Sequence, residues 1–206
     1  MTSSTEAASR KTETAPLPWH EFETLVAKLV TDIQVRKLTK RHRVLMGAAL
    51  GTYCGLRGGD VLRLRWKDLV NQQSLVVQEQ KTGKRRDIAL NPKLQELVAF
   101  VYGAIGNPDG ETLVMSNRRS QGSKAVSIQF YNTEIAQVLK EHGITTQNPS
   151  SHTWRKSFGA RIFELNNRNE EALIVLSQIF NHSSTAITRR YIGLQQQRIA
   201  DVYMSM

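Results

Sequence analysis

Four side chains in the last third of the sequence have types suited to the chemistry of a phosphodiester. His152 and Arg155 lie three residues apart in the segment SHTWR, a spacing that places an imidazole and a guanidinium on one face of a helix, where they can grip the same anion. His182 opens the segment HSST, which is typical of a helix start, and Tyr191 follows nine residues later, directly after two arginines. A phenol with its ordinary pKa of about 10 is a poor nucleophile, so Tyr191 becomes a candidate nucleophile only if nearby cations stabilise its phenolate.

Two further cations of this kind lie earlier in the chain. Arg57 stands at a junction between two expected helices, and Asp60, one turn on, is expected to hold its guanidinium or the fold around it. Lys81 lies in the segment KTGK between two β-like runs, at the exposed tip of an expected hairpin, where it can reach a nucleic-acid groove and protonate a phosphate oxygen. Taken singly, each has an ordinary alternative, a surface arginine and a solubilising turn lysine.

The composition favours a polyanionic partner. The chain has 206 residues, is 40% hydrophobic and carries a formal net charge of +10. This length and apolar content suffice for the core of one domain. The charge makes nucleic acid the expected partner, with a solvated basic surface as the alternative. No run of about 18 apolar residues is present, so we expect no membrane partner.

The residue types argue against disulfides, metals and other cofactors. Cys54 is the single cysteine, which excludes a disulfide framework and a cysteine-based metal site. The five histidines have no acidic neighbours at metal-binding spacing, and the sequence has no glycine-rich phosphate loop, so we expect no cofactor. The N-terminus lacks the apolar core of a signal peptide, which favours an intracellular location.

Periodicity predicts a mainly α fold with one small antiparallel β-sheet, an α+β domain over residues 16–206. Residues 1–15 lack periodicity and precede two prolines, so we expect a disordered N-terminal arm there. The predicted hairpin has strands over residues 75–80 and 86–90. The predicted helices cover residues 19–33, about 41–53, a short segment after Gly55, 91–104, 127–142, 152–166, 170–180 and 185–191.

A last helix is expected over about residues 194–206. Its apolar residues recur at near-helical spacing, which produces a stripe that must pack against something. The helix packs either on its own domain or on a neighbouring protomer, and the sequence leaves both possibilities open.

Three exposed basic stretches are candidates for contacts to a nucleic-acid backbone. They are the hairpin tip, a flexible loop with the sequence SNRRSQGSK, and the arginine pair before Tyr191. Their candidate contact residues are Lys84; Arg118, Arg119 and Lys124; and Arg189 and Arg190.

The motifs, taken in order, resemble the catalytic domain of the tyrosine recombinases, the phage-integrase family, from about residue 19 to the C-terminus. The resemblance implies the tyrosine recombinase catalytic-domain fold and, as partner, double-stranded DNA, with self-association into a tetramer on paired DNA sites and a location at the nucleoid in the cytoplasm of a prokaryotic cell. It is carried by five motifs, namely GLR with Arg57, QKTGK with Lys81, HTWR with His152 and Arg155, NHSS with His182, and the final Tyr191.

The resemblance implies a site-specific recombinase that cleaves and rejoins DNA strands through a 3′-phosphotyrosine intermediate without a metal. Tyr191 would be the nucleophile, Arg57 and Arg155 would clamp the non-bridging phosphate oxygens, and His182 would be a further donor.

The remaining two candidates would handle protons. His152 would share the phosphate or accept the nucleophile's proton, and Lys81 would protonate the departing 5′-hydroxyl.

Three departures from the family pattern stand out. Asn181 occupies the position before His182 where the family usually has glycine, which would shift the turn that leads into the following helix. The interval between His152 and His182 is a few residues longer than in the family pattern, and a polar insert near residues 166–171 is its expected source. Members commonly carry an N-terminal clamp domain, and only eighteen residues precede Trp19, so the chain is either a short recombinase or part of a longer one.

Two other functions fit part of the pattern. A type IB topoisomerase has a similar set of residues and would relax supercoiled DNA as a single protomer. A basic DNA-binding regulator would carry the charge without the catalysis.

Overall fold

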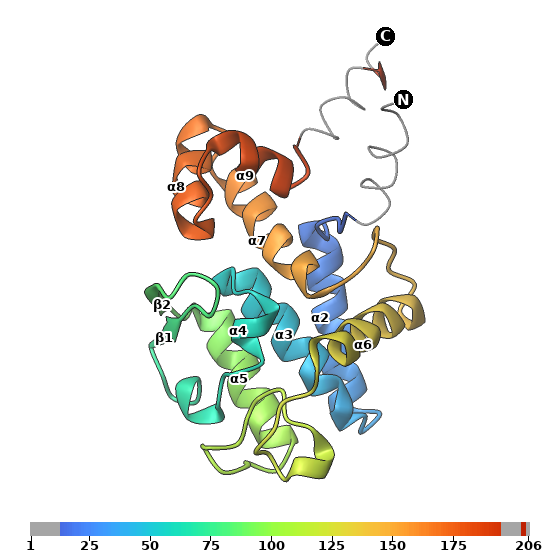
Figure 1. The fold of residues 1–206 in the computed structure, drawn as a ribbon. Helices are drawn as coiled ribbons and strands as arrows, with labels where there is room; N and C mark the ends of the chain where they lie inside the picture. Colours follow the sequence, from blue (N-terminus) through green and yellow to red (C-terminus); the bar gives the residue numbers. More distant parts are fainter. Residues whose placement is uncertain (1–12, 195–202, 205–206) are drawn as a thin grey trace, which may run out of the picture.

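The computed structural model describes residues 13–194 and 203–204 (Figure 1). Within them the fold is mainly helical with one two-stranded antiparallel sheet, so the predicted fold class is confirmed. The elements are α2 (Trp19–Gln34), η1 (Thr39–Arg41), α3 (His42–Cys54), α4 (Gly58–Val61), η2 (Trp66–Asp68), β1 (Ser74–Gln78), β2 (Arg85–Ala89), α5 (Pro92–Ala104), η3 (Arg118–Ser120), α6 (Ile128–Glu141), α7 (Ser151–Leu165), α8 (Glu170–Phe180) and α9 (Thr185–Tyr191).

The two ends of the chain only partly fall in the described region. Residues 1–12 of the predicted arm and residues 195–202 and 205–206 of the predicted last helix lie outside it. Residues 13–15 lie against the segment before α7, where the Ala15 N–H donates to the Gln147 carbonyl over 3.0 Å. None of the helices described is long and apolar enough to cross a membrane.

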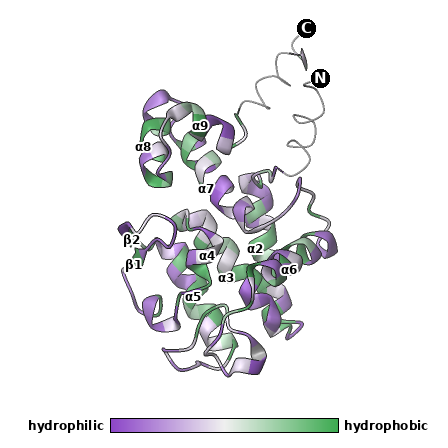
Figure 2. Ribbon diagram, viewed as in Figure 1, coloured by the Kyte–Doolittle hydropathy of each residue, from purple (hydrophilic) through white to green (hydrophobic). Residues whose placement is uncertain are grey.

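Helix α3 is buried along almost its whole length and lies at the centre of the fold (Figure 2). Two glycines allow its neighbours to approach its backbone. A Cβ atom at Gly51 would lie 2.4 Å from the Cβ of Trp154 on α7, and one at Gly47 would lie 1.8 Å from the hydroxyl of Tyr131 on α6. The position of α7, which carries two of the candidate site residues, therefore depends on the absence of a side chain at Gly51, and the position of α6 on its absence at Gly47.

Side-chain caps set where the helices that carry site residues begin. At the start of α7 the Ser150 hydroxyl accepts from the His152 N–H over 3.3 Å, while the Ser150 N–H donates to Thr153 Oγ1 over 3.1 Å. At the start of α9 the Ser184 hydroxyl accepts from the Ile187 N–H. Such caps satisfy N–H groups that have no partner within the helix, so they hold His152 at the first turn of α7.

Helix α7 joins two hydrophobic clusters. Its first half contributes Trp154 to the main core around α3, whereas Phe158 and Phe163 pack with α8, α9 and Ile192 in a second, smaller cluster. In Figure 1, α8 and α9 lie together at one end of the molecule, above the hairpin. We call residues 170–191 the α8–α9 unit, and we call the boundary between this unit and the main core the seam. Helix α7 crosses the seam, because it contributes to both hydrophobic clusters.

The predicted antiparallel hairpin forms, with Ser74 opposite Ala89 and Gln78 opposite Arg85. Its first strand ends at Gln78, two residues before the predicted end at residue 80. Its tip closes through bonds from the Gly83 N–H to the Glu79 carbonyl and from the Glu79 N–H to the Lys84 carbonyl, with Gly83 at a φ of 66°. This positive φ is the conformation that favours glycine in such turns.

The close packing of α3 and α7 at Gly51 can be tested by its effect on stability. Gly51→Ala should destabilise the fold by about 1–3 kcal/mol, because the new methyl group overlaps Trp154 in a packed core. Gly103→Ala on α5 is the matched control, since nothing lies within 4 Å of a Cβ there, and it should change stability by less than about 1 kcal/mol in the stabilising direction. Urea unfolding followed by circular dichroism measures both, and equal stabilities for the two variants would contradict the packing argument.

Candidate active site

The two candidate arginines meet at one backbone oxygen. Arg57, the N-cap of α4, donates from Nη2 to the carbonyl of Phe180 over 3.1 Å, and Arg155 on α7 donates to the same oxygen over 3.5 Å. Arg155 also donates to the carbonyl of Gly55 and stacks its guanidinium 4.5 Å from the centroid of the Phe180 ring. Residues 57 and 155, far apart in sequence, are thus brought together at the end of α8.

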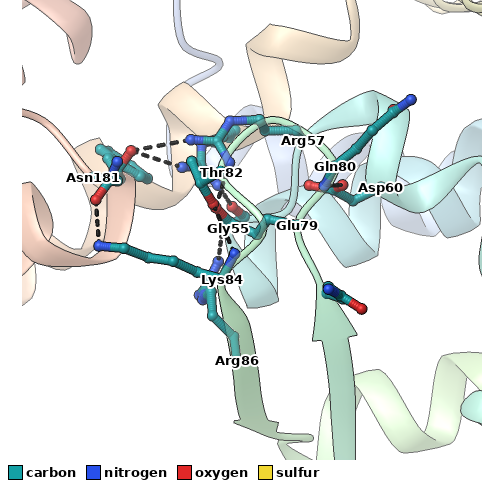
Figure 3. A network of polar contacts seen from close by, with 12 residues as sticks. Gly55, Arg57, Asp60, Glu79, Gln80, Thr82, Lys84, Arg86 and Asn181 are labelled. Atoms are coloured by element: carbon teal, nitrogen blue, oxygen red, sulfur yellow. Dashed lines mark hydrogen bonds and ion pairs between the residues drawn. The ribbon is translucent and has the colours of Figure 1, made fainter.

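A buried carboxylate balances part of this charge (Figure 3). Glu79, only 2% exposed, accepts from Arg57 Nη1 over 2.6 Å and from Arg86 Nη1 over 3.3 Å, and it also accepts from the Thr82 hydroxyl. Burial by itself raises the pKa of Glu79, but the hydrogen bonds from Arg57 and Thr82 and the nearby positive charges outweigh it and lower the pKa.

Asp60 has one of the two roles expected for it. Asp60 does not hold the guanidinium; its Oδ1 accepts from the Gln80 N–H over 2.9 Å and so ties the hairpin to α4 (Figure 3). Asp60 is buried one turn into α4, whereas Arg57 caps that helix with an extended backbone and turns toward the end of α8. Its other role, holding the fold around Arg57, is confirmed by the bond to Gln80.

Arg155 is held in an unusually enclosed position. Arg155 is only 2% exposed. Burial together with the charge of Arg57 lowers the pKa of its guanidinium to about 10. The guanidinium therefore stays charged at neutral pH. Because carbonyl oxygens already satisfy it, the charge is kept in place without a carboxylate of its own.

Tyr191 and His182 belong to the α8–α9 unit, and their rings pack against each other. The two ring centroids are 5.1 Å apart, and each ring also contacts the ring of Phe180. Burial raises the pKa of Tyr191, while the charges of Arg155 and Arg57 and a hydrogen bond with Arg155 oppose the rise. The phenol is therefore neutral in the free protein and stands beside the cations that would stabilise its phenolate.

His152 and Lys81 line a cleft together with Arg57. The cleft has a volume of about 250 Å³ and lies between α4, the hairpin tip and the start of α7. Loss of hydration and the charges of Lys156, Arg155, Arg57 and Lys81 lower the pKa of His152. At neutral pH this imidazole is therefore uncharged and can accept a proton. The structure thus brings all six sequence-predicted candidates to one region.

Asn181 keeps the turn that glycine would make. It ends α8 in the left-handed conformation, with φ 56° and ψ 49°, which asparagine tolerates better than most residues. The expected shift of the turn is therefore wrong. In addition, the Asn181 side chain accepts a hydrogen bond from the ammonium group of Lys84, which joins the hairpin tip to the α8–α9 unit (Figure 3).

The remaining basic candidates occupy two other places. Arg119 and Lys124 are exposed on the loop around η3, which Figure 1 shows at the end of the molecule opposite α8 and α9; Arg118 belongs to the same loop. On α9, Arg190 is exposed and Arg189 forms an ion pair with Glu170 of α8. Contacts of these residues to DNA stay predictions.

Sequence reasoning missed Glu79, although a signal was present. Leu75, Val77 and Glu79 alternate along one face of the hairpin, and all three are buried. A glutamate in phase with buried strand residues needs cationic partners, which here are the two arginines. Thr188, fully buried beside His182, was also missed, and no comparable pattern marks it.

The contribution of the Glu79 carboxylate to stability can be tested by removing its charge. Glu79→Gln should lower the free energy of unfolding by about 1–3 kcal/mol at pH 7, because two arginines lose a charged partner. Since the folded pKa of Glu79 is depressed, this difference should be full above the unfolded value of about 4.3 and shrink as the pH falls further.

The matched control is Glu111→Gln, which removes an exposed carboxylate paired with Lys67 and Arg65 and should cost less than about 1 kcal/mol. Urea unfolding between pH 7 and pH 3 measures both variants. A Glu79→Gln deficit that grows as the pH falls would contradict the assigned network.

Comparison with known proteins agrees with this geometry. The model of the phage integrase family matches residues 17–198. The probable integrase/recombinase YoeC of Bacillus subtilis (strain 168) is 28% identical over 177 residues, which cover 84% of this chain and 90% of that protein.

Solved structures share the fold at low sequence identity. XerH site-specific recombinase, in its post-cleavage complex with palindromic difH substrate, matches with a TM-score of 0.67 and 16% identity over 93% of this chain. The match covers 52% of the XerH chain, so this chain spans about half the length of that protein. The lambda integrase catalytic core matches with a TM-score of 0.53 and 18% identity over 79% of this chain and 90% of that chain.

The family model covers most of the chain, and the fold agrees with that of recombinase catalytic domains. The polypeptide belongs to the phage integrase family, the tyrosine recombinases.

Proposed function

We propose that the protein is a site-specific recombinase that cleaves and rejoins duplex DNA with Tyr191 as nucleophile. The observation that carries the proposal is the meeting of Arg57 and Arg155 at the Phe180 carbonyl, with the Tyr191 ring packed on the Phe180 side chain. Two guanidiniums beside a phenol suit attack on a phosphodiester, whose transition state gains negative charge on the non-bridging oxygens. Family membership supports the same reaction.

The chemistry is a transesterification. The Tyr191 oxygen forms a bond to phosphorus and the bond from phosphorus to the 5′-oxygen breaks, which leaves a 3′-phosphotyrosine link. His152 takes the phenolic proton, and Lys81 supplies a proton to the departing 5′-oxygen. Because the link conserves the energy of the original bond, a 5′-hydroxyl from another strand can reverse the step.

The three remaining polar groups stabilise charge. Arg57 and Arg155 donate to the non-bridging oxygens, and His182 donates to one of them from the α9 side. In the free protein the Phe180 carbonyl and Glu79 occupy part of the donor capacity of Arg57. Binding of a phosphate at this site therefore requires the guanidinium to exchange or share these partners.

Assembly follows from the charge and the arrangement of the chain. Double-stranded DNA is the proposed partner, with tetramers forming on paired sites; XerH has been solved bound to its palindromic difH substrate, and lambda integrase as a dimer on a COC′ core site.

We propose residues 16–206 as the catalytic domain after an N-terminal arm of residues 1–15, with the segment after residue 194 docked in cis or on a neighbour. The proposed location is with the chromosome in a prokaryotic cytoplasm.

The two rival functions are less well supported. Relaxation of supercoils needs the same cleavage step, but the relatives named above are described as recombinases and integrases. A non-catalytic regulator would have no need for a phenol, an imidazole and two guanidiniums at one place.

The nucleophile can be tested directly. Tyr191→Phe should form no covalent complex with a nicked half-site duplex, because the attacking oxygen is missing, whereas wild-type protein should form one that survives detergent. Tyr203→Phe is the control, since Tyr203 is 75% exposed and should be dispensable for cleavage. A complex formed by Tyr191→Phe and lost in Tyr203→Phe would reverse the assignment.

The charge-neutralising role of the arginines has a consequence for metal dependence. Cleavage of the half-site should persist in excess EDTA, since guanidiniums do what Mg²⁺ does in a two-metal nuclease. A magnesium-dependent nuclease in the same buffer serves as control for chelation. Loss of cleavage in EDTA, with recovery on adding Mg²⁺, would refute this mechanism.

A further inference from the structure

A chain of hydrogen bonds leads from His182 into the interior of the α8–α9 unit. His182 Nδ1 lies 3.0 Å from the hydroxyl of Thr188, which lies 2.8 Å from the hydroxyl of Ser177. The Ser177 hydroxyl in turn lies 2.7 Å from the carbonyl of Leu173. Thr188 is 0% exposed and Ser177 is buried, so both hydroxyls have only protein partners available.

The directions of these bonds can be worked out from one end. A hydroxyl has a single proton, and two oxygens 2.7 Å apart need a proton between them, so Ser177 donates to the Leu173 carbonyl. Ser177 then has no proton left for Thr188, and Thr188 must donate across the 2.8 Å contact. Its alternative acceptor, the Ser184 carbonyl at 3.4 Å, would use the same proton. In either arrangement Thr188 can only accept from His182.

We propose that Thr188 and Ser177 are positioning residues that fix the neutral His182 ring as the tautomer with its proton on Nδ1 and a lone pair on Nε2. The two hydroxyls do not touch the reacting atoms. They act through His182, because the carbonyl at the end of the chain sets the direction of each bond before it. Nε2, the nitrogen left for the reaction, is then an acceptor until the ring gains a second proton.

The consequence for catalysis rests on the proposed function. His182 can donate to a phosphate oxygen from Nε2 only as imidazolium. The groups facing the ring are Tyr191 on α9, Arg155 on α7, Arg57 before α4 and Lys81 on the hairpin. Burial and the three cations lower the pKa of His182 in the free protein, and a bound phosphate would oppose them. The donor form should thus be favoured when DNA occupies the site.

The tautomer can be read without any assay of activity. The full chain is labelled with ¹⁵N-histidine, and the signal of His182 is identified by its loss in His182→Gln. Long-range ¹H–¹⁵N correlation at about pH 8, above the ordinary histidine pKa of about 6.5, distinguishes a protonated Nδ1 from a protonated Nε2. Wild-type protein should show the proton on Nδ1, and a proton on Nε2 would overturn the proposal.

Variants at Thr188 separate this role from a packing role. Thr188→Ser keeps the hydroxyl and should keep the tautomer. Thr188→Val keeps the shape but removes the acceptor, so the neutral ring should move its proton to Nε2. Thr185→Val, the same change one turn earlier on α9, is the matched control and should leave the tautomer unchanged. Circular dichroism checks folding, and an Nδ1-protonated ring in a folded Thr188→Val protein would also overturn the proposal.

A pH profile tests the kinetic consequence separately. The rate of half-site cleavage by wild-type protein should fall as the pH rises through the pKa of His182 in the DNA complex, because Nε2–H is lost. In Thr188→Val the neutral ring still presents Nε2–H, so this fall should be weaker, whereas Thr188→Ser should follow wild type. Identical profiles for wild type and Thr188→Val would overturn the kinetic role, while the tautomer measurement would stand by itself.

Discussion

The arrangement of the site depends on one constraint, the free-energy cost of placing two positively charged guanidiniums close together where they are partly buried. Arg57 and Arg155 approach each other closely, and Arg155 is almost fully enclosed. Such an arrangement is stable only if oxygen atoms satisfy the guanidinium protons. The Phe180 and Gly55 carbonyls and the Glu79 carboxylate do this, and all three come from points where a helix or strand ends.

The position of Phe180 explains why the seam between the two hydrophobic clusters is the site. Phe180 is the last residue of α8, where carbonyls have no helical N–H partners and the helix dipole is negative. Its carbonyl receives arginines attached to the main core, and its ring contacts Tyr191 and His182 from the α8–α9 unit. One residue thus connects the phosphate-binding cations to the nucleophile.

The hairpin is a second link across the seam. Its tip is joined to α4 by the bond from the Gln80 N–H to Asp60 and to Asn181 through Lys84, and Glu79, next to the tip, contacts Arg57. A glycine at position 181 would make the same turn but not this bond. The position of Lys81, on the same tip, therefore depends on contacts with both sides of the seam.

The sequence by itself determined the helices, the hairpin and the six candidate residues, because periodicity, helix caps and short motifs can each be recognised from neighbouring residues. Only the tertiary structure decided the partners: Glu79 in place of Asp60 for Arg57, the shared Phe180 carbonyl, and the hydroxyls of Thr188 and Ser177 behind His182. These contacts join residues whose separation along the chain carries no pattern. They depend instead on how α3, α7 and α8 pack, which glycines and buried aromatic rings determine together.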